Sequence, residues 1–182
     1  MKVIKTSIAD ALLLKPKIFN DDRGFFLESW NKKNLMEIAG INQEFVQDNH
    51  SKSFKGVLRG MHYQLEKPQG KLVRATLGRI LDVIIDIRRS SPTFGQHYAV
   101  ELNDQNHLQL WAPVGIAHGF LVLSNEAEIQ YKTTDYYAPE FEQTILWSDS
   151  KLGIDWKIDG LIPIVSTKDK EGIAFKDAAY FD

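Results

Sequence analysis

Alternating hydrophobic and polar residues along much of the chain predict β-strands, because successive side chains of a strand point to opposite faces. The clearest run covers residues 80–87, where Asp82 and Asp86 share the less apolar face and an Arg-Arg-Ser-Ser-Pro sequence ends the strand. More runs rich in β-branched and aromatic residues are predicted as strands, at residues 25–30, 57–61, 72–77, 98–102, 107–112, 119–123 and 128–133.

Clusters of Gly, Pro, Asn and Asp separate these runs at short intervals, a spacing typical of a β-sandwich or barrel. The sequence has neither the strand–helix alternation of a parallel sheet nor an internal repeat. One convincing helix precedes the last third, at residues 31–39, with Asn31 as N-cap and Gly40 after its end. The tail from Asp155 is interpreted as irregular structure and short helices packed on the barrel.

Length and composition fit one ordinary domain with a real core, since 43% of the 182 residues are hydrophobic. We therefore expect a single domain over residues 1–182. The formal net charge of -2 gives no field suited to a nucleic acid or an anionic membrane. The lack of cysteine excludes disulfides, thiolate metal sites and a cysteine nucleophile. A polar N-terminus and no stretch of membrane-spanning length predict a soluble, cytoplasmic protein.

Of the five histidines, His62 and His118 have the most unusual surroundings, each at a strand edge close to a glycine, Gly60 or Gly119. Glycine lets a backbone approach a ligand closely or adopt a conformation that other residues avoid. A hydrogen-bonded core residue is nevertheless the more common role of a lone histidine. The local sequence leaves both interpretations open.

Two histidines on strands also raise the hypothesis of a metal site, because small β-barrel enzymes often bind iron, manganese or zinc through imidazoles. Such a site usually has a His-x-His pair, a carboxylate and a third histidine. Gln64 stands at the second position of that pair after His62. The ligand set is incomplete, and we expect no metal and no other cofactor.

Cations cluster in sequence around these histidines: Arg59 is three residues before His62, and Lys71 begins the next predicted strand. A strand-borne arginine that faces the same cavity as a histidine suits phosphate, because its planar fork binds such oxygens bidentately. Arg23 is a second candidate, although the role of an ordinary turn arginine is equally compatible with its surroundings.

Two further segments have several possible roles. Residues 47–53 form a dense run of polar donors and acceptors, which is usually a loop. Tyr131, Tyr136 and Tyr137 are compatible with aromatic core, a ring-stacking surface or a proton donor, and the sequence favours core.

Eight segments occur in order between Phe19 and Asp169: Arg23-Gly24-x-Phe26, Gln47-Asp48-Asn49-x-Ser51, Leu58-Arg59-Gly60-Met61-His62-Tyr63-Gln64, Gln69-Gly70-Lys71-Leu72-Val73, Asp86-Ile87-Arg88-x-x-Ser91-Pro92-Thr93-Phe94-Gly95, Pro113-x-Gly115-x-Ala117-His118-Gly119-Phe120, Tyr131-Lys132-x-Thr134-x-Tyr136-Tyr137 and Ser166-x-Lys168-Asp169. Together they are far more specific than any one alone. In this order they resemble the dTDP-4-dehydrorhamnose 3,5-epimerase family.

The resemblance implies a mainly β, cupin-type jelly roll, also called a double-stranded β-helix, with a few short helices mostly toward the C-terminus. It implies a homodimer with exchanged N-terminal strands, and no metal despite the fold. The implied substrate is a dTDP-4-keto-6-deoxyhexose that is epimerised at C3 and C5 on the way to dTDP-L-rhamnose.

The resemblance also implies roles for single residues. His62 is the expected base, Asp169 accepts its other ring N–H, and Tyr131 is the acid on the opposite face. Lys71 is expected to stabilise the oxyanion at C4, with support from His118. The remaining positions are expected to bind substrate. Arg23 and Arg59 are expected to hold the diphosphate, and Glu28, Gln47, Asp48 and Asn49 to contact the nucleotide end. Tyr137, Glu142 and Lys168 are expected at the rim of the substrate site.

Two other functions are compatible with this sequence. A relative that inverts only C3 or only C5 of a similar dTDP-ketosugar would use the same residues. A non-catalytic sugar-binding or metal-binding cupin would have no need of His62, Tyr131 and Asp169 together.

Overall fold

The computed structural model describes residues 1–158 and 160–182, and most of them form β-strands. The strands are β1 Lys2–Lys5, β2 Leu12–Lys15, β3 Ile18–Asp21, β4 Gly24–Leu27, β5 Gln47–Phe54, β6 Val57–Gln64, β7 Lys71–Leu77, β8 Arg79–Asp86, β9 His97–Asn103, β10 Gln109–Ala112, β11 Ile116–Val122, β12 Glu126–Thr133, β13 Glu142–Thr144 and β14 Ile164–Val165. The helices are α1 Lys32–Ala39, α2 Thr167–Lys170 and the 3-10 turns η1 Pro139–Phe141 and η2 Phe175–Asp177.

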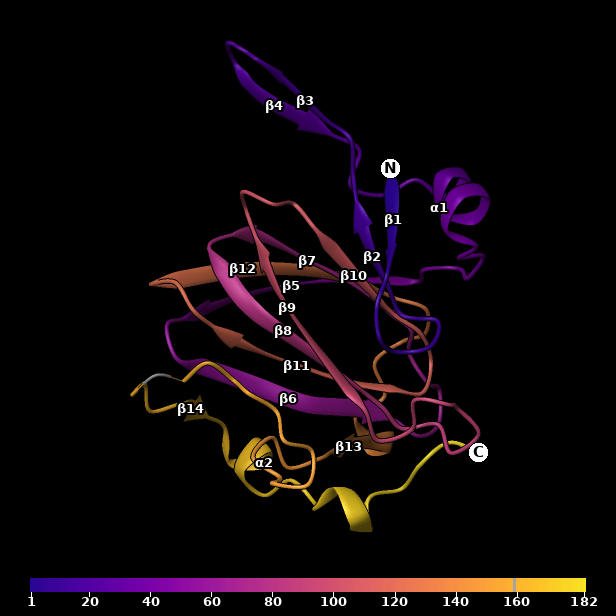
Figure 1. Cartoon of the computed structure of the whole chain (residues 1–182), viewed down its shortest axis with the longest axis vertical. Coiled ribbons are helices and arrows are strands. Elements are labelled where there is room, and N and C mark those ends of the chain that lie inside the picture. Colours follow the sequence, from indigo (N-terminus) through magenta and orange to yellow (C-terminus); the bar gives the residue numbers. More distant parts are fainter. Residues whose placement is uncertain (159) are drawn as a thin grey trace.

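Two sheets pack against each other as a sandwich (Figure 1). The first sheet has the order β1-β2-β10-β7-β12-β5, and the second has the order β13-β6-β11-β8-β9, with β14 beside β6. The β3–β4 hairpin forms a separate pair that extends from the top of the molecule in Figure 1. At the opposite end, α2 and the C-terminal tail lie beside β6 and β13.

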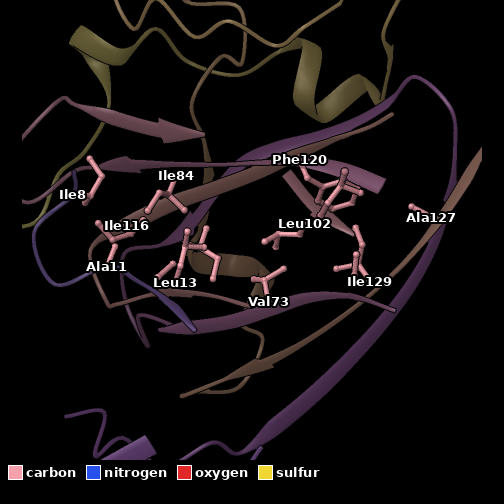
Figure 2. Close-up of a cluster of buried hydrophobic side chains, with 14 of the residues drawn as sticks. Ile8, Ala11, Leu13, Val73, Ile84, Leu102, Ile116, Phe120, Ala127 and Ile129 are labelled. Atoms are coloured by element: carbon pink, nitrogen blue, oxygen red, sulfur yellow. The ribbon is translucent and has the colours of Figure 1, made fainter. Parts of the chain in front are cut away.

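Aliphatic side chains from alternating strand positions fill the space between the two sheets (Figure 2). Val73 and Ile129 reach it from the first sheet, while Ile84, Ile116 and Phe120 reach it from the second. The next positions along the second sheet point to its outer face and pack under the C-terminal tail. The second sheet is therefore buried on both faces.

A carboxylate inside this buried sheet explains the motif at residues 86–95. Asp86 is fully buried and accepts hydrogen bonds from Arg88, Ser91 and Thr93. Burial raises the pKa of Asp86, but these hydrogen bonds outweigh it and lower the pKa to about 2. Arg88 also pairs with Asp10, so the motif fastens the β1–β2 connection to the sandwich.

The helix prediction is confirmed: the Asn31 side chain accepts a hydrogen bond from the Asn34 N–H, and Gly40 ends α1 in the left-handed conformation. The strand predictions are confirmed too, apart from boundary shifts such as that of β4. The loop prediction for residues 47–53 is wrong, because this run pairs with β12 along its whole length as β5. Periodicity did not predict β1, β2, β3, β13 or β14, which are too short to show a pattern.

The tail after Asp155 has the predicted character. It contains β14, α2 and η2, and its apolar residues, among them Trp156, pack on the outer face of the second sheet. Across the described ranges, no helix is long and apolar enough to cross a membrane.

Candidate active site

The two singled-out histidines lie next to each other on neighbouring strands. His62 on β6 and His118 on β11 are direct register partners. Ile116 and Phe120, two residues before and after His118, point into the space between the sheets, so His118 shares their face of β11. A Cβ on Gly60 would lie 2.5 Å from the Gly119 Cα, so both glycines allow β6 and β11 to approach closely here. The glycines near the histidines thus serve a strand contact.

His62 is held by a carboxylate from the C-terminal tail. Its Nε2 hydrogen-bonds to Asp169 Oδ1, across 107 residues of sequence. Ser166 caps α2 by accepting the Asp169 N–H, which fixes the position of the carboxylate. Burial raises the pKa of Asp169, but hydrogen bonds from His62, Ser166 and the Gly60 backbone outweigh it and leave the pKa below its usual value. Asp169 therefore carries a negative charge next to the His62 ring.

His118 has a partner of its own. Its Nε2 lies 2.6 Å from Asp82 Oδ1, and Asp82 is fully buried on the adjacent strand β8. The other carboxylate oxygen of Asp82 is buried without a hydrogen bond in the part of the chain that the structure describes. The resemblance did not assign Asp82 a role, although an acidic residue inside the most apolar strand was a usable signal.

Lys71 crosses the space between the sheets. It begins β7 in the first sheet, and its Nζ donates to the backbone carbonyl of His62 at 3.5 Å. Burial lowers the pKa of Lys71 to about 8, although Glu142 and Asp82 oppose the shift. A buried ammonium beside two histidine–carboxylate pairs is suited to stabilising a developing negative charge.

Tyr131 approaches the site from the first sheet. It lies on β12 opposite Asn49, and its ring packs against the core between the sheets. Burial raises the pKa of Tyr131, and the charge of Glu142 raises it further against the effect of Arg59. The hydroxyl is therefore protonated at neutral pH and can donate a proton.

Glu142 links the histidine to the rim. Its Oε1 lies 3.9 Å from His62 Nδ1, and its Oε2 accepts a hydrogen bond from the Tyr137 hydroxyl at 2.7 Å and pairs with Lys168. The structure thus brings the predicted rim residues Tyr137, Glu142 and Lys168 together beside the predicted base.

A cavity of about 460 Å³ opens beside this cluster. Arg59, His62, Lys168 and Asp169 are among its lining residues. Arg59 donates to the Ser53 hydroxyl of β5 at 3.2 Å, so its guanidinium spans the two sheets at the cavity wall. The sequence singled out the arginine but not this serine.

The predicted nucleotide-binding run divides between the two faces of β5. Gln47 and Asn49 hydrogen-bond to each other on the side of Tyr131, and the Gln47 amide also accepts the Tyr137 N–H. Asp48 points to the other face, where it pairs with Lys132 at 2.7 Å. Strand alternation therefore separates the Asp48 carboxylate from the cluster.

Arg23 and Glu28 are not brought to this cluster within one chain. The Arg23 side chain is 89% exposed at the tip of the β3–β4 hairpin and pairs with Asp21. Glu28 accepts hydrogen bonds from Asn31 and Asn34 at the start of α1. In Figure 1 this region lies at the opposite end of the molecule from α2 and β13.

Gln64 stands where a His-x-His metal site would have its second histidine, and its side chain hydrogen-bonds to backbone groups. Its amide donates to the carbonyls of Lys67 and Tyr136 and accepts the Ala138 N–H. Within residues 1–158 and 160–182, no three His, Asp or Glu side chains are grouped so as to hold a metal ion. Metal independence stays a prediction.

A two-sheet jelly roll whose cavity is lined by a histidine–carboxylate pair, with a buried lysine next to that histidine, is the architecture of a cupin-fold enzyme. The family model described as dTDP-4-dehydrorhamnose 3,5-epimerase matches residues 5–177. The chain belongs to the dTDP-4-dehydrorhamnose 3,5-epimerase family. The resemblance of the ordered motifs is thereby confirmed, as is the prediction of an isomerase.

Similar proteins cover the chain along its whole length. Relatives named dTDP-4-dehydrorhamnose 3,5-epimerase are 56% identical over 182 residues in Shigella flexneri and 53% identical over 181 residues in Pseudomonas aeruginosa. Each match covers 100% of this chain and 99% of the relative. A solved dTDP-6-deoxy-D-glucose-3,5-epimerase from Legionella pneumophila, in complex with dTDP-4-keto-L-rhamnose, has a TM-score of 0.95 and 47% identity, covering 98% of this chain and 94% of that one. The predicted cupin-type jelly roll is confirmed by this match.

Proposed function

We infer that the chain inverts C3 and C5 of dTDP-4-dehydro-6-deoxy-D-glucose to give dTDP-4-dehydro-L-rhamnose, a step of dTDP-L-rhamnose biosynthesis. One observation carries the mechanism: His62, held by Asp169 of the C-terminal tail, and Tyr131 come from opposite sheets, and the Lys71 ammonium reaches across to the His62 backbone. Inversion requires a base on one face of a sugar ring and an acid on the other.

The chemistry of the substrate allows one site to serve both centres. The C4 ketone flanks C3 and C5, and loss of either proton gives an enolate with its charge on the same oxygen. In the all-equatorial chair of a gluco-configured ring, the hydrogens on C3 and C5 are axial on the same face. A single base therefore reaches both hydrogens.

Each side chain then has one task. His62 takes the proton at Nδ1, because Asp169 occupies Nε2 and holds the ring in one orientation. Tyr131 returns a proton to the other face. Lys71 stabilises the enolate oxygen, which for a single preorganised donor contributes about 3–4 kcal/mol. Arg59 and Lys168 supply positive charge for the diphosphate.

The base is tested by His62→Ala and His62→Asn, with turnover of the defined ketosugar in deuterated water. Both variants should lose deuterium incorporation at C3 and C5, because no other group takes the proton, while nucleotide-sugar binding stays largely intact. Normal exchange in either variant would end the assignment of His62.

The acid is tested by Tyr131→Phe in the same assay. Proton removal at His62 should continue and give exchange, but inversion should fail because no donor faces the opposite side. Unchanged epimerisation would remove Tyr131 from the mechanism. Wild-type product with only one inverted centre, seen by NMR, would instead identify a mono-epimerase.

We further propose that the active form is a homodimer in which the β3–β4 hairpin of one copy completes the site of the other. An isolated hairpin is marginally stable in water, yet this one exposes Phe19, Phe25 and Phe26. In Figure 1 the hairpin lies at the opposite end of the molecule from α2, which carries the Asp169 partner of His62. A second copy supplies both a cover for the aromatic rings and a site within reach of Arg23.

Mixed dimers distinguish a site that Arg23 of the other copy completes from a site made within one chain. Arg23→Ala and His62→Ala chains, each impaired alone, are co-expressed with different tags and purified as the heterodimer. If Arg23 acts on the partner's site, one site per dimer is intact and about half of the wild-type activity returns. No recovery, or a monomer in light scattering, would contradict the shared site.

A further inference from the structure

Two successive inversions at one base place a demand on the site beyond the chemistry of a single inversion. After the first inversion His62 carries an extra proton and Tyr131 has lost one. Before the second inversion His62 must lose that proton and Tyr131 must regain one. Asp169 holds Nε2 of His62, so the added proton is on Nδ1 and has to leave from that side.

Glu142 lies where such a proton can leave. It sits on β13, which pairs with β6 beside the histidine, and its Oε1 is 3.9 Å from His62 Nδ1. Its side chain is only 13% exposed. Its other oxygen binds Tyr137, which is 53% exposed, and Lys168, which also reaches solvent. One buried carboxylate thus joins the base to two groups at the surface.

We propose that Glu142 resets the site between the two inversions by taking the proton from His62 Nδ1 and releasing it to water past Tyr137 and Lys168. The proposal rests on the double inversion inferred above. The Nδ1–H bond breaks as an O–H bond forms on Glu142, and this proton then passes to water. The Tyr131 oxygen takes one proton from water, so the reset changes neither the net charge nor the proton count of the site.

The charges around Glu142 suit a transient acceptor. Burial raises its pKa, but hydrogen bonds from Lys168 and Tyr137 and the charge of His62 outweigh this and leave the pKa below its usual value. Glu142 is therefore ionised between turnovers and does not retain the proton. The same negative charge, after the effect of burial, raises the pKa of Tyr131 and favours its reprotonation.

Glu142→Gln tests the relay, because glutamine keeps the size of the side chain and one acceptor oxygen for Tyr137, but cannot accept the proton. With dTDP-4-dehydro-6-deoxy-D-glucose in deuterated water, the first exchange should slow far less than the second inversion, because the first needs no reset. The second inversion should slow by about 10²-fold, and a singly inverted ketosugar should accumulate in the NMR time course.

Glu142→Asp is the second variant, since it keeps a carboxylate and shortens the chain. A relay predicts that aspartate restores the doubly inverted product better than glutamine does. A packing or binding role predicts the reverse order, because glutamine fills the original volume. Glu128→Gln removes a carboxylate on β12 that pairs with His50 on β5, and this control variant should release no intermediate.

Two results would overturn the relay by different routes. The relay would be refuted, and the proposed function would stand, if Glu142→Gln formed the doubly inverted product without accumulating more singly inverted ketosugar than the wild type does. Wild-type enzyme that inverts a single centre would refute the proposed function itself, and with it the need for a reset.

Discussion

Two histidine–carboxylate pairs lie side by side in this site, and they are built differently. His118 takes Asp82 from the next strand of the same sheet, and its side chain is 10% exposed. His62 takes Asp169 from the C-terminal tail, and its side chain is 25% exposed at the wall of the cavity. One pair is sealed within the sandwich and the other opens to the ligand space.

The difference is consistent with the roles proposed for the two rings. A base must meet substrate and exchange protons, so one nitrogen has to face the cavity while the other is held. His62 lines the cavity, with Asp169 at Nε2 and Glu142 3.9 Å from Nδ1. The sealed pair is suited to holding a fixed hydrogen bond next to the Lys71 ammonium, whose charge is attracted by Asp82. The greater exposure of its side chain thus distinguishes the proposed base from its neighbour.

Asp169→Asn should have the largest effect on activity, because it removes the charge that orients His62 and stabilises its protonated form. We expect kcat to fall by about 10²- to 10⁴-fold, with substrate affinity little changed. Steady-state kinetics with a reductase-coupled assay measure both parameters. A loss below about tenfold would mean that His62 does not depend on its partner.

Asp82→Ala should lower the free energy of unfolding more than Asp169→Ala does. Removal of Asp82 leaves the His118 imidazole buried without its partner, which costs about 1–3 kcal/mol in the free energy of unfolding. Asp169→Ala is the matched control, and its cost should be smaller because His62 can turn to water in the cavity. Urea denaturation compares the two variants. Equal losses would contradict the distinction between a sealed and an open pair.

Lys71→Arg tests the cation beside both pairs and should have the smallest effect at neutral pH. An ammonium is charged below its pKa, and burial lowers the pKa of Lys71 to about 8, so the cation is lost as pH rises through that value. We expect kcat/KM of the wild type to fall about tenfold per pH unit above this point. Arginine stays protonated, so the variant should lack this limb. An unchanged limb in Lys71→Arg would assign the titration to another group.

Local sequence predicted the elements with a clear signal. The helix at residues 31–39 followed from its cap and its terminal glycine, and the strands followed from alternation. The β5 strand was mistaken for a loop because its residues are polar, although its backbone hydrogen bonds to β12 do not depend on side-chain polarity. Tertiary pairing decided this element.

In the candidate site, too, local sequence predicted some features and tertiary structure decided others. His62 and His118 drew notice through their glycines, but a lone histidine is more often structural, and only the ordered motifs changed that interpretation. Asp82 had no assigned role, because its importance depends on the side chain opposite it in the neighbouring strand. Asp48 was grouped with Gln47 and Asn49 by sequence, and the pleat of β5 places it on the other face.

The sequence by itself determined the mainly β class, the α1 helix, the family and the residue types needed for proton transfer. The tertiary structure decided which of those residues meet: it brought Asp169 to His62 across 107 residues, and Lys71 from one sheet to the other. The reason is physical. Periodicity and caps are set by neighbours along the chain, whereas the distance between a base and its partner is set by how sheets and tail pack.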